Sequence, residues 1–215
     1  MRARRPGTVY ALRAFPMLHT GAQLHTLANI LSAAGALLRR RPAAAEDLLA
    51  HLVAYLRDLL GLRRPLIPLA DELRLALTFI GLERVRMGSR IRLEVTCTPE
   101  SLAALVPPLV LHPLVENAVR HGIAHRPMGG RIRIQGRTAA GTLHLAVTDD
   151  GPGIRRTAAA ARTVGWGLTG VRLRLAALCG PAARLRILSG AEAGTMAIIS
   201  LPLMETPVTA SGPNV

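Results

Sequence analysis

The part of the sequence that decides the fold reads VPPLVLHPLVENAVRHG, residues 106–122. Its apolar residues recur at helical spacing and predict a helix over residues 109–121, with Glu116 and Asn117 on a polar edge. An Asn carbonyl is a suitable ligand for Mg²⁺, which prefers oxygen donors and keeps most of its waters. A neighbouring carboxylate can orient or deprotonate a nucleophile. The pair therefore indicates a magnesium site, although Glu-Asn taken alone is more often a solvated helix face.

The second motif is the acidic glycine segment Asp149-Asp150-Gly151-Pro152-Gly153, which follows a predicted strand. A carboxylate at a strand end can accept a hydrogen bond from an exocyclic amine such as that of adenine. Gly151 and Gly153 let the backbone come close to a flat ring, because glycine has no side chain to obstruct it. The same five residues are also typical of an ordinary turn.

The third motif is the glycine pair Gly165 and Gly167, which leads directly into a helix predicted from Leu168. Free amides and the positive end of the helix dipole at this position suit phosphate oxygens. The connecting stretch carries three arginines and predicts a mobile lid whose guanidinium groups meet a triphosphate: Arg155, Arg156 and Arg162. Taken alone, the motif is more often a loop with a core Trp.

In this order the three segments resemble the N, G1 and G2 boxes of the GHKL ATPases. The sequence of residues 106–122 resembles the corresponding segment of the LytS-type sensor histidine kinases in particular. The resemblance extends over nearly the whole chain after about Met17. It includes residues 69–73 and 82–88 in the connecting helix, residues 171–175 after the third motif, and the glycine turn Gly194-Thr195 before the last strand.

The resemblance implies that the chain binds ATP with Mg²⁺ and transfers the terminal phosphoryl group to a histidine. Onward transfer to an aspartate on a response regulator receiver domain is implied as well. By this carry-over Asn117 binds Mg²⁺ and Asp149 holds the adenine. The remaining cofactor-binding residues implied are Gly151, Gly153, Arg156, Gly165, Gly167, Leu168 and Thr195.

The fold class expected is α+β. Two helical stripes, within residues 17–41 and 48–60, predict an antiparallel hairpin. One hairpin cannot bury both apolar faces, so a homodimeric four-helix bundle is expected. A helix over residues 69–87 follows, with Asp71 and Glu72 where the helix dipole favours carboxylates. Period-two patterns then predict five strands, over residues 90–96, 131–137, 142–148, 184–189 and 195–201.

The resemblance makes the strand-rich part a GHKL, or Bergerat, α/β sandwich with a mixed sheet. The domain organisation predicted is an N-terminal extension over residues 1–16 and a dimerisation and phosphoacceptor hairpin over 17–68. The connecting helix and ATP-binding domain then span residues 69–204, and residues 205–215 form a disordered tail.

The phosphoacceptor position departs from the family. Its acceptor segment reads Asn-Pro-His-Phe-Leu-Phe-Asn-Thr-Leu-Asn, and the matching residues 19–28 place Gly21 where the histidine belongs. His25 lies four residues later, on the same helix face and about 6 Å along the axis. His19 is rotated about 200° from that face, so His25 is the better candidate. Alternatively His25 only packs or caps, and the chain is a degenerate kinase that binds nucleotide as a regulatory interaction module.

The composition argues against a nucleic-acid-binding protein and against a membrane-spanning one. All 27 positive side chains are Arg and give a net charge of +14, but they are scattered along the chain. Only 2% of residues are aromatic, which leaves little for bases to stack on, so no nucleic-acid partner is expected. No apolar run reaches the ~18 residues of a membrane segment. Cys97 and Cys179 lie far apart and indicate a reducing, cytoplasmic location.

Overall fold

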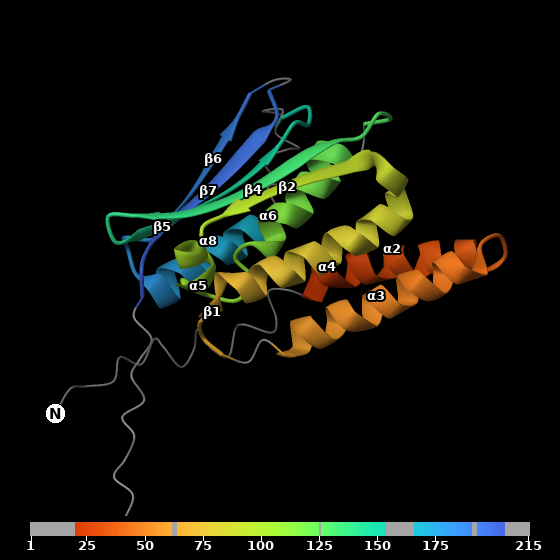
Figure 1. Cartoon of the computed structure of the whole chain (residues 1–215), viewed down its shortest axis with the longest axis horizontal. Helices are drawn as coiled ribbons and strands as arrows, with labels where there is room; N and C mark the ends of the chain where they lie inside the picture. Colours follow the sequence, from red (N-terminus) through yellow and green to blue (C-terminus); the bar gives the residue numbers. More distant parts are fainter. Residues whose placement is uncertain (1–19, 62–63, 125, 154–165, 191–192, 205–215) are drawn as a thin grey trace, which may run out of the picture.

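The computed structural model describes residues 20–61, 64–124, 126–153, 166–190 and 193–204. A helical part formed by the described residues between 20 and 87 lies along one side of a sheet-containing part (Figure 1). The predicted α+β fold with a mixed sheet is confirmed.

The helical hairpin consists of α2 (Thr20–Leu38) and α3 (Pro42–Gly61). Leu37 carbonyl accepts hydrogen bonds from the amides of Arg40 and Arg41, at 3.0 and 2.7 Å, which closes the turn between the helices. Pro42 is the first residue of α3, where its missing N–H costs no hydrogen bond. The buried residues of the hairpin are Ile30, Ala34, Ala45, Leu48, Leu52 and Tyr55.

Helix α4 (Leu69–Met87) has the bounds that the sequence predicts. It follows β1 (Ile67–Pro68) and packs against both α3 and the helix that carries the first motif. Gly88, with a φ of +72°, ends α4. A single 3₁₀ turn (Gly88–Arg90) then leads into the sheet.

The five-stranded sheet has the order β2-β4-β5-β7-β6. Its strands are β2 (Ile91–Cys97), β4 (Gly130–Ala139), β5 (Thr142–Asp149), β6 (Arg184–Ser189) and β7 (Thr195–Pro202). β2 pairs with β4 in parallel, and every other pair is antiparallel. All five predicted strands are therefore present, within one or two residues at most ends.

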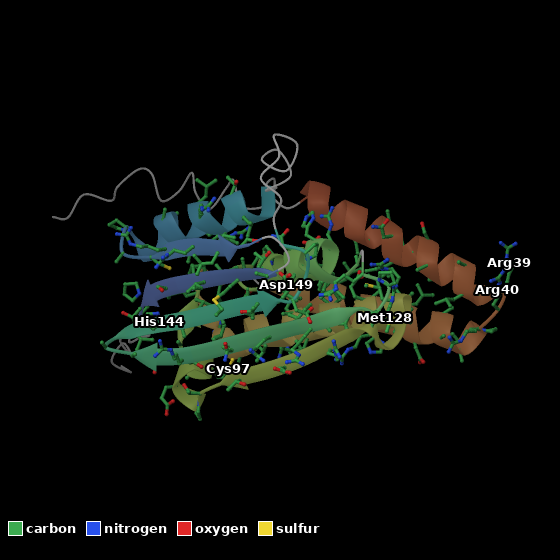
Figure 2. The ribbon with its side chains drawn as sticks, turned by 90° about the horizontal axis from the view of Figure 1, so that it is seen from above. Arg39, Arg40, Cys97, Met128, His144 and Asp149 are labelled. Carbon is green, nitrogen blue, oxygen red and sulfur yellow. The ribbon has the colours of Figure 1, made fainter. Side chains whose placement is uncertain are left out.

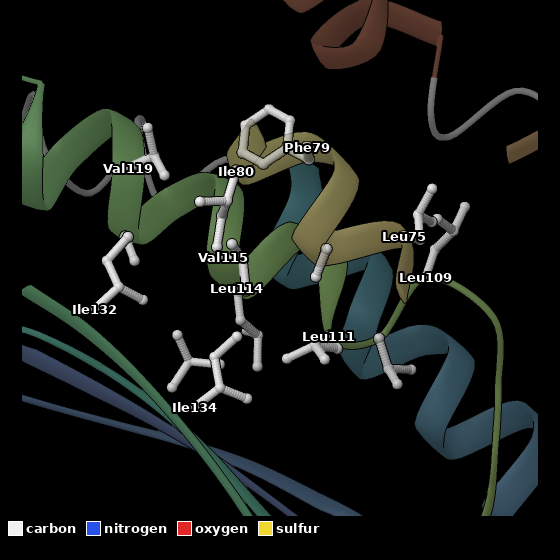
Figure 3. Packing of buried hydrophobic residues seen from close by; sticks show 14 of the residues in the cluster. Leu75, Phe79, Ile80, Leu109, Leu111, Leu114, Val115, Val119, Ile132 and Ile134 are labelled. Atoms are coloured by element: carbon white, nitrogen blue, oxygen red, sulfur yellow. The ribbon is translucent and has the colours of Figure 1, made fainter. Parts of the chain in front are cut away.

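One face of the sheet packs on helices. Side chains of α4 and of α6 (His112–Asn117) meet Ile132 and Ile134 of β4 in the core (Figure 3). A π-helical turn (Ala118–Ile123) extends α6, and α8 (Trp166–Cys179) lies beside it. The helix predicted to begin at residue 109 therefore begins at His112, and residues 107–111 are not helical. Three short elements were not predicted, namely β1, α5 (Pro99–Ala103) and β3 (Leu105–Val106).

An aromatic cluster joins the hairpin to the rest of the protein. Tyr55 of α3 forms a 3.0 Å hydrogen bond between its hydroxyl and Nε2 of His112, the first residue of α6. Phe79 of α4 meets the His112 ring edge-on, with centroids 5.0 Å apart. All three rings are buried. The first motif is therefore in direct contact with the hairpin.

Both cysteines are free and half-buried, with Cys97 in β2 and Cys179 at the end of α8. None of the helices in the described ranges combines the length and the hydropathy that crossing a membrane requires.

Tyr55→Phe tests the aromatic junction. Loss of the hydroxyl removes a buried hydrogen bond to His112, so the free energy of unfolding should fall by about 1–3 kcal/mol. Chemical denaturation measures this change, and Ala54→Ser, an exposed neighbour on α3, serves as the control with an effect within about 0.5 kcal/mol. Equal stability of the two variants would contradict the contact.

Candidate functional site

Asp149 ends β5 and is only 6% exposed. Its Oδ1 atom accepts a 2.9 Å hydrogen bond from the amide of Gly151. Figure 2 places Asp149 and His144 toward opposite ends of the same strand. The carboxylate is thus held at a strand end by local backbone, as the sequence predicts.

The neighbouring Asp150 faces the other way. It is exposed, and its Oδ1 atom accepts a 2.7 Å hydrogen bond from the amide of Arg131. The Arg126 guanidinium lies 3.3 Å from the same oxygen and also donates to the Asp150 carbonyl. Of the two consecutive aspartates, only Asp149 is directed into the protein.

The pKa of Asp149 is raised above its ordinary value. Burial is the main cause, because it disfavours the charged carboxylate. Hydrogen bonds from the amides of Gly151 and Thr195 lower the pKa, as does Arg126, whereas Asp150 raises it further. A partly desolvated carboxylate at a strand end is well suited to accept a hydrogen bond from a bound ligand.

Gly122, at the end of the first motif, lies directly on Asp149. A Cβ atom at Gly122 would lie 2.6 Å from Cγ of Asp149, and one at Gly151 would lie 2.4 Å from Cα of Gly122. Only glycine fits either position without displacing its neighbour. The structure therefore brings the first and second motifs into contact. Sequence reasoning did not assign Gly122 a role, although a glycine within a helical pattern is a signal for close approach.

Two further glycines make close backbone contacts, one after β5 and one directly before β7. Gly153 has a φ of +74°, and a Cβ there would lie 2.0 Å from the carbonyl oxygen of Gly190. Gly194, with a φ of +76°, would place a Cβ equally close to the carbonyl oxygen of Asp149. Thr195 is the residue paired with Asp149 across β5 and β7. Gly153 and Thr195 thus lie near Asp149, as expected of one site.

Glu116 and Asn117 occupy the last turn of α6. Glu116 is 8% exposed, so it is buried rather than on a solvated edge, and its Oε1 atom lies 3.7 Å from Nη1 of Arg120. Asn117 is half-buried. Both side chains carry oxygen donors of the kind that Mg²⁺ prefers, so the donor set fits this ion.

The third motif meets the first at the start of α8. A Cβ at Gly167 would lie 3.5 Å from Cβ of Pro113, and the side chain of Leu168 is buried. Gly167 and Leu168 are therefore positioned beside α6. Gly165 and Arg156, together with Arg155 and Arg162, lie outside the described residues. His25 belongs to α2, but its side chain is outside the description as well.

The first motif thus contacts the second through Gly122 and lies beside the start of α8 through Pro113. Residues 107–205 match the family model for histidine kinase-, DNA gyrase B- and HSP90-like ATPases. Residues 16–91 match the model for histidine kinases. With both models in this order, the chain belongs to the histidine kinase family.

Relatives in this family agree with the assignment. The chain is 30% identical over 188 residues to the sensor protein LytS of Bacillus anthracis, covering 83% of this chain and 32% of that protein. It is also 30% identical over 160 residues to the sensor histidine kinase BtsS of Escherichia coli K12, covering 74% and 28%. The chain therefore spans about a third of the length of the curated relatives it matches.

Solved structures share the fold. The histidine kinase domain of the Erythrobacter litoralis EL346 blue-light activated kinase has a TM-score of 0.52 at 20% identity. That match covers 93% of this chain and 95% of the other. The Acinetobacter baumannii histidine kinase AdeS has a TM-score of 0.50 at 21% identity, covering 75% and 81%.

Asp149→Asn should stabilise the protein in the absence of ligand at neutral pH. Because the pKa of Asp149 is raised in the folded state, its stabilising contribution is complete below the unfolded pKa and is lost as the pH rises through the folded pKa. The neutral amide avoids this loss, so the advantage of Asn should shrink as the pH falls through the raised folded pKa of Asp149 and should be absent below about pH 4, the ordinary pKa of an aspartate. Urea denaturation across this range measures it.

Asp150→Asn is the matched control, since this carboxylate is exposed and bonded to Arg126 and Arg131. It should bring no gain in stability. A pH-independent difference between Asp149→Asn and the unmodified protein would contradict the explanation.

Proposed function

We propose that the chain is the catalytic core of a two-component sensor histidine kinase that binds ATP with Mg²⁺ and phosphorylates a histidine. The observation that carries this proposal is the contact of Gly122 and Gly151 with the buried Asp149. It brings the first and second motifs together, although Gly122 and Asp149 are 27 residues apart in the sequence. Their combined side chains suit the binding of a nucleotide.

In this proposal the Asp149 carboxylate accepts a hydrogen bond from the exocyclic amine of adenine. The glycine turns at Gly151 and Gly153 leave room for the flat ring. The backbone amides of Gly165, Gly167 and Leu168 bind the phosphates. Asn117 is the protein ligand of Mg²⁺, which neutralises charge on the triphosphate when bound. Arg156 and Thr195 complete the nucleotide site.

The proposed reaction is a phosphoryl transfer. A ring nitrogen of His25 attacks the terminal phosphorus, and the bond to the bridging oxygen breaks, so that ADP leaves with the electron pair. Glu116 orients the imidazole or accepts its proton. Positioning and charge neutralisation supply most of the catalysis in reactions of this class. A response regulator aspartate then receives the phosphoryl group.

A homodimer is the proposed assembly, located in the cytoplasm. Leu31 and Leu38 of α2 are 54% and 52% exposed, and Val53 and Leu60 of α3 are 45% and 74% exposed. Each pair is separated by seven residues, the spacing of a seam between packed helices. The hairpin of a second copy of the chain would cover the exposed pairs on α2 and α3, and its own exposed pairs would be covered in return.

The second candidate function is a regulatory module that binds nucleotide without phosphorylating itself. Gly21 favours it, because this residue occupies the family's acceptor position. ATP affinity without formation of phosphohistidine would distinguish this module from a kinase.

Nucleotide binding is tested by calorimetry with ATP and Mg²⁺. Asn117→Ala and Asp149→Asn should each weaken binding on the order of tenfold or more, because each removes a polar contact to the ligand. His144→Gln is the control, since His144 bonds to Ser200 on β7, away from Asp149. No binding by the unmodified protein would remove the nucleotide proposal.

Phosphorylation is tested with γ-labelled ATP and mapping of the modified residue. His25→Gln should abolish the acid-labile label and leave ATP affinity unchanged. His51→Gln, at an exposed position of α3, should leave the label intact. Labelling that persists in His25→Gln would exclude this residue as the acceptor.

The dimer is tested by light scattering. The unmodified chain should have twice the mass of one chain, and the double variant Leu31→Gln/Leu38→Gln should shift toward the monomer. Leu188→Gln on β6, which is 47% exposed, is the control. A monomeric unmodified protein would contradict the assembly.

A further inference from the structure

Three buried charged side chains of the described residues lie outside all three motifs, and two of them, Glu72 and Arg174, bind the backbone just before α6. Glu72 of α4 is fully buried, and Arg174 of α8 is 5% exposed. Burying a charge is unfavourable unless it is bonded to polar partners, so both positions require a structural or functional explanation.

The Glu72 carboxylate caps the segment that leads into α6. Its Oε1 atom accepts from the Leu109 amide at 2.5 Å, and its Oε2 atom accepts from the amides of Val110 and Leu111, each at 2.9 Å. Leu111, the residue before α6, provides no side-chain cap of its own. A residue 37 to 39 positions earlier in the chain therefore accepts from the amides of the three residues that lead into α6.

Leu109 is held from both sides in an unusual conformation. Its φ is +59°, in the left-handed region that favours glycine. Its amide donates to Glu72, and its carbonyl accepts a 2.6 Å hydrogen bond from Nη1 of Arg174. Backbone strain of this kind persists only where surrounding contacts enforce it, and it concentrates at functional sites.

The charges support each other. Burial lowers the pKa of Arg174 to about 10, and the negative charge of Glu72 opposes that decrease, so the guanidinium stays charged at neutral pH. Burial likewise raises the pKa of Glu72, and the amides of residues 109–112 lower it. The backbone of Leu109 lies between these two side chains.

The three elements that meet at Leu109 all lead to the candidate site. Helix α4 connects the hairpin to the sheet, α8 begins at the third motif, and α6 ends in Glu116 and Asn117. The far end of the first motif is fixed separately, because Gly122 lies on Asp149. The adenine side and the metal side of the site therefore have different supports.

We propose that Glu72 and Arg174 are positioning residues of the nucleotide site, which hold the Leu109 peptide and thereby fix where α6 presents Asn117 to the metal and phosphates. This inference rests on the proposed function. It makes a specific claim about the ligand: the pair governs the contribution of Mg²⁺ to ATP binding, and contacts to adenine depend on it much less.

The test is calorimetry of ATP binding with Mg²⁺ and with EDTA. Glu72→Gln should weaken binding of the magnesium complex on the order of tenfold to a hundredfold, as displaced catalytic groups do. Binding of metal-free ATP should change less than about twofold. A role confined to stability would leave both affinities of the folded protein unchanged, or lower them together.

The matched control is Glu83→Gln. Glu83 is another buried carboxylate of α4, 5% exposed, and it pairs with Arg86 on the same helix at 2.5 Å instead of with α6. It should lower stability without a selective loss of the magnesium-dependent affinity. The same selective loss in Glu83→Gln would overturn the proposal.

A rescue variant separates positioning from stability. Glycine adopts a positive φ without strain, so Leu109→Gly added to Glu72→Gln should restore much of the magnesium-dependent affinity. Loss of the buried leucine side chain should lower the melting temperature at the same time. Affinity and stability then move in opposite directions, and failure of the rescue would count against the proposal.

Arg174→Lys decides the matter if Glu72→Gln does not fold. Lysine keeps the charge but lacks the planar guanidinium, so a selective loss of magnesium-dependent affinity is expected again. Unchanged affinity in a folded Arg174→Lys would overturn the proposal. If the unmodified protein does not bind ATP, the proposed function fails first and this inference with it. If it binds ATP and the variants bind equally, only the inference fails.

Discussion

The architecture of the site depends on how one short helix is fixed at both of its ends. Just before its start, the backbone amides of residues 109–111 donate to the carboxylate of Glu72, which belongs to α4. At its far end, Gly122 lies against the buried Asp149 with no room for a Cβ atom. A helix of this length is not stable by itself, so tertiary contacts must determine its position. The orientation of Glu116 and Asn117 follows from these two contacts.

Both contacts place charge where burial disfavours it. Asp149 has a raised pKa mainly because it is desolvated, and the same cause dominates at Glu72. Backbone amides compensate part of this cost at each position. Buried polar groups that lower stability are typical of functional sites, because a site needs polar groups that are already held in position before the ligand binds. The two carboxylates therefore carry more functional information than the apolar core around them.

The sequence was sufficient to predict the fold, and its second motif lies against the first in the structure. Local signals identified α4 with its observed bounds, namely Pro68 before it, carboxylates in its first turn and Gly88 after it. The order of the three motifs predicted that Asp149, Gly151 and Asn117 belong to one region. The roles of Glu72 and Arg174 could not be predicted, since their partners lie 37 and 65 residues away in the chain and are backbone groups. Every residue type has the same backbone carbonyl, and nearly every type has the same amide, so the residue type does not reveal which backbone group is bound.

His112 illustrates the same limit and has a mechanical consequence. The sequence pattern gives this residue no distinct role, but in the structure its ring contacts Tyr55 of α3 and Phe79 of α4. The residue that begins α6 is thus bonded to the hairpin, while Glu72 bonds to the residues just before it. Displacement of the hairpin relative to the sheet must therefore either carry the start of α6 along or break the Tyr55 contact. Because packed interfaces tend to have discrete arrangements and do not deform continuously, such a displacement acts on the position of Asn117 in steps.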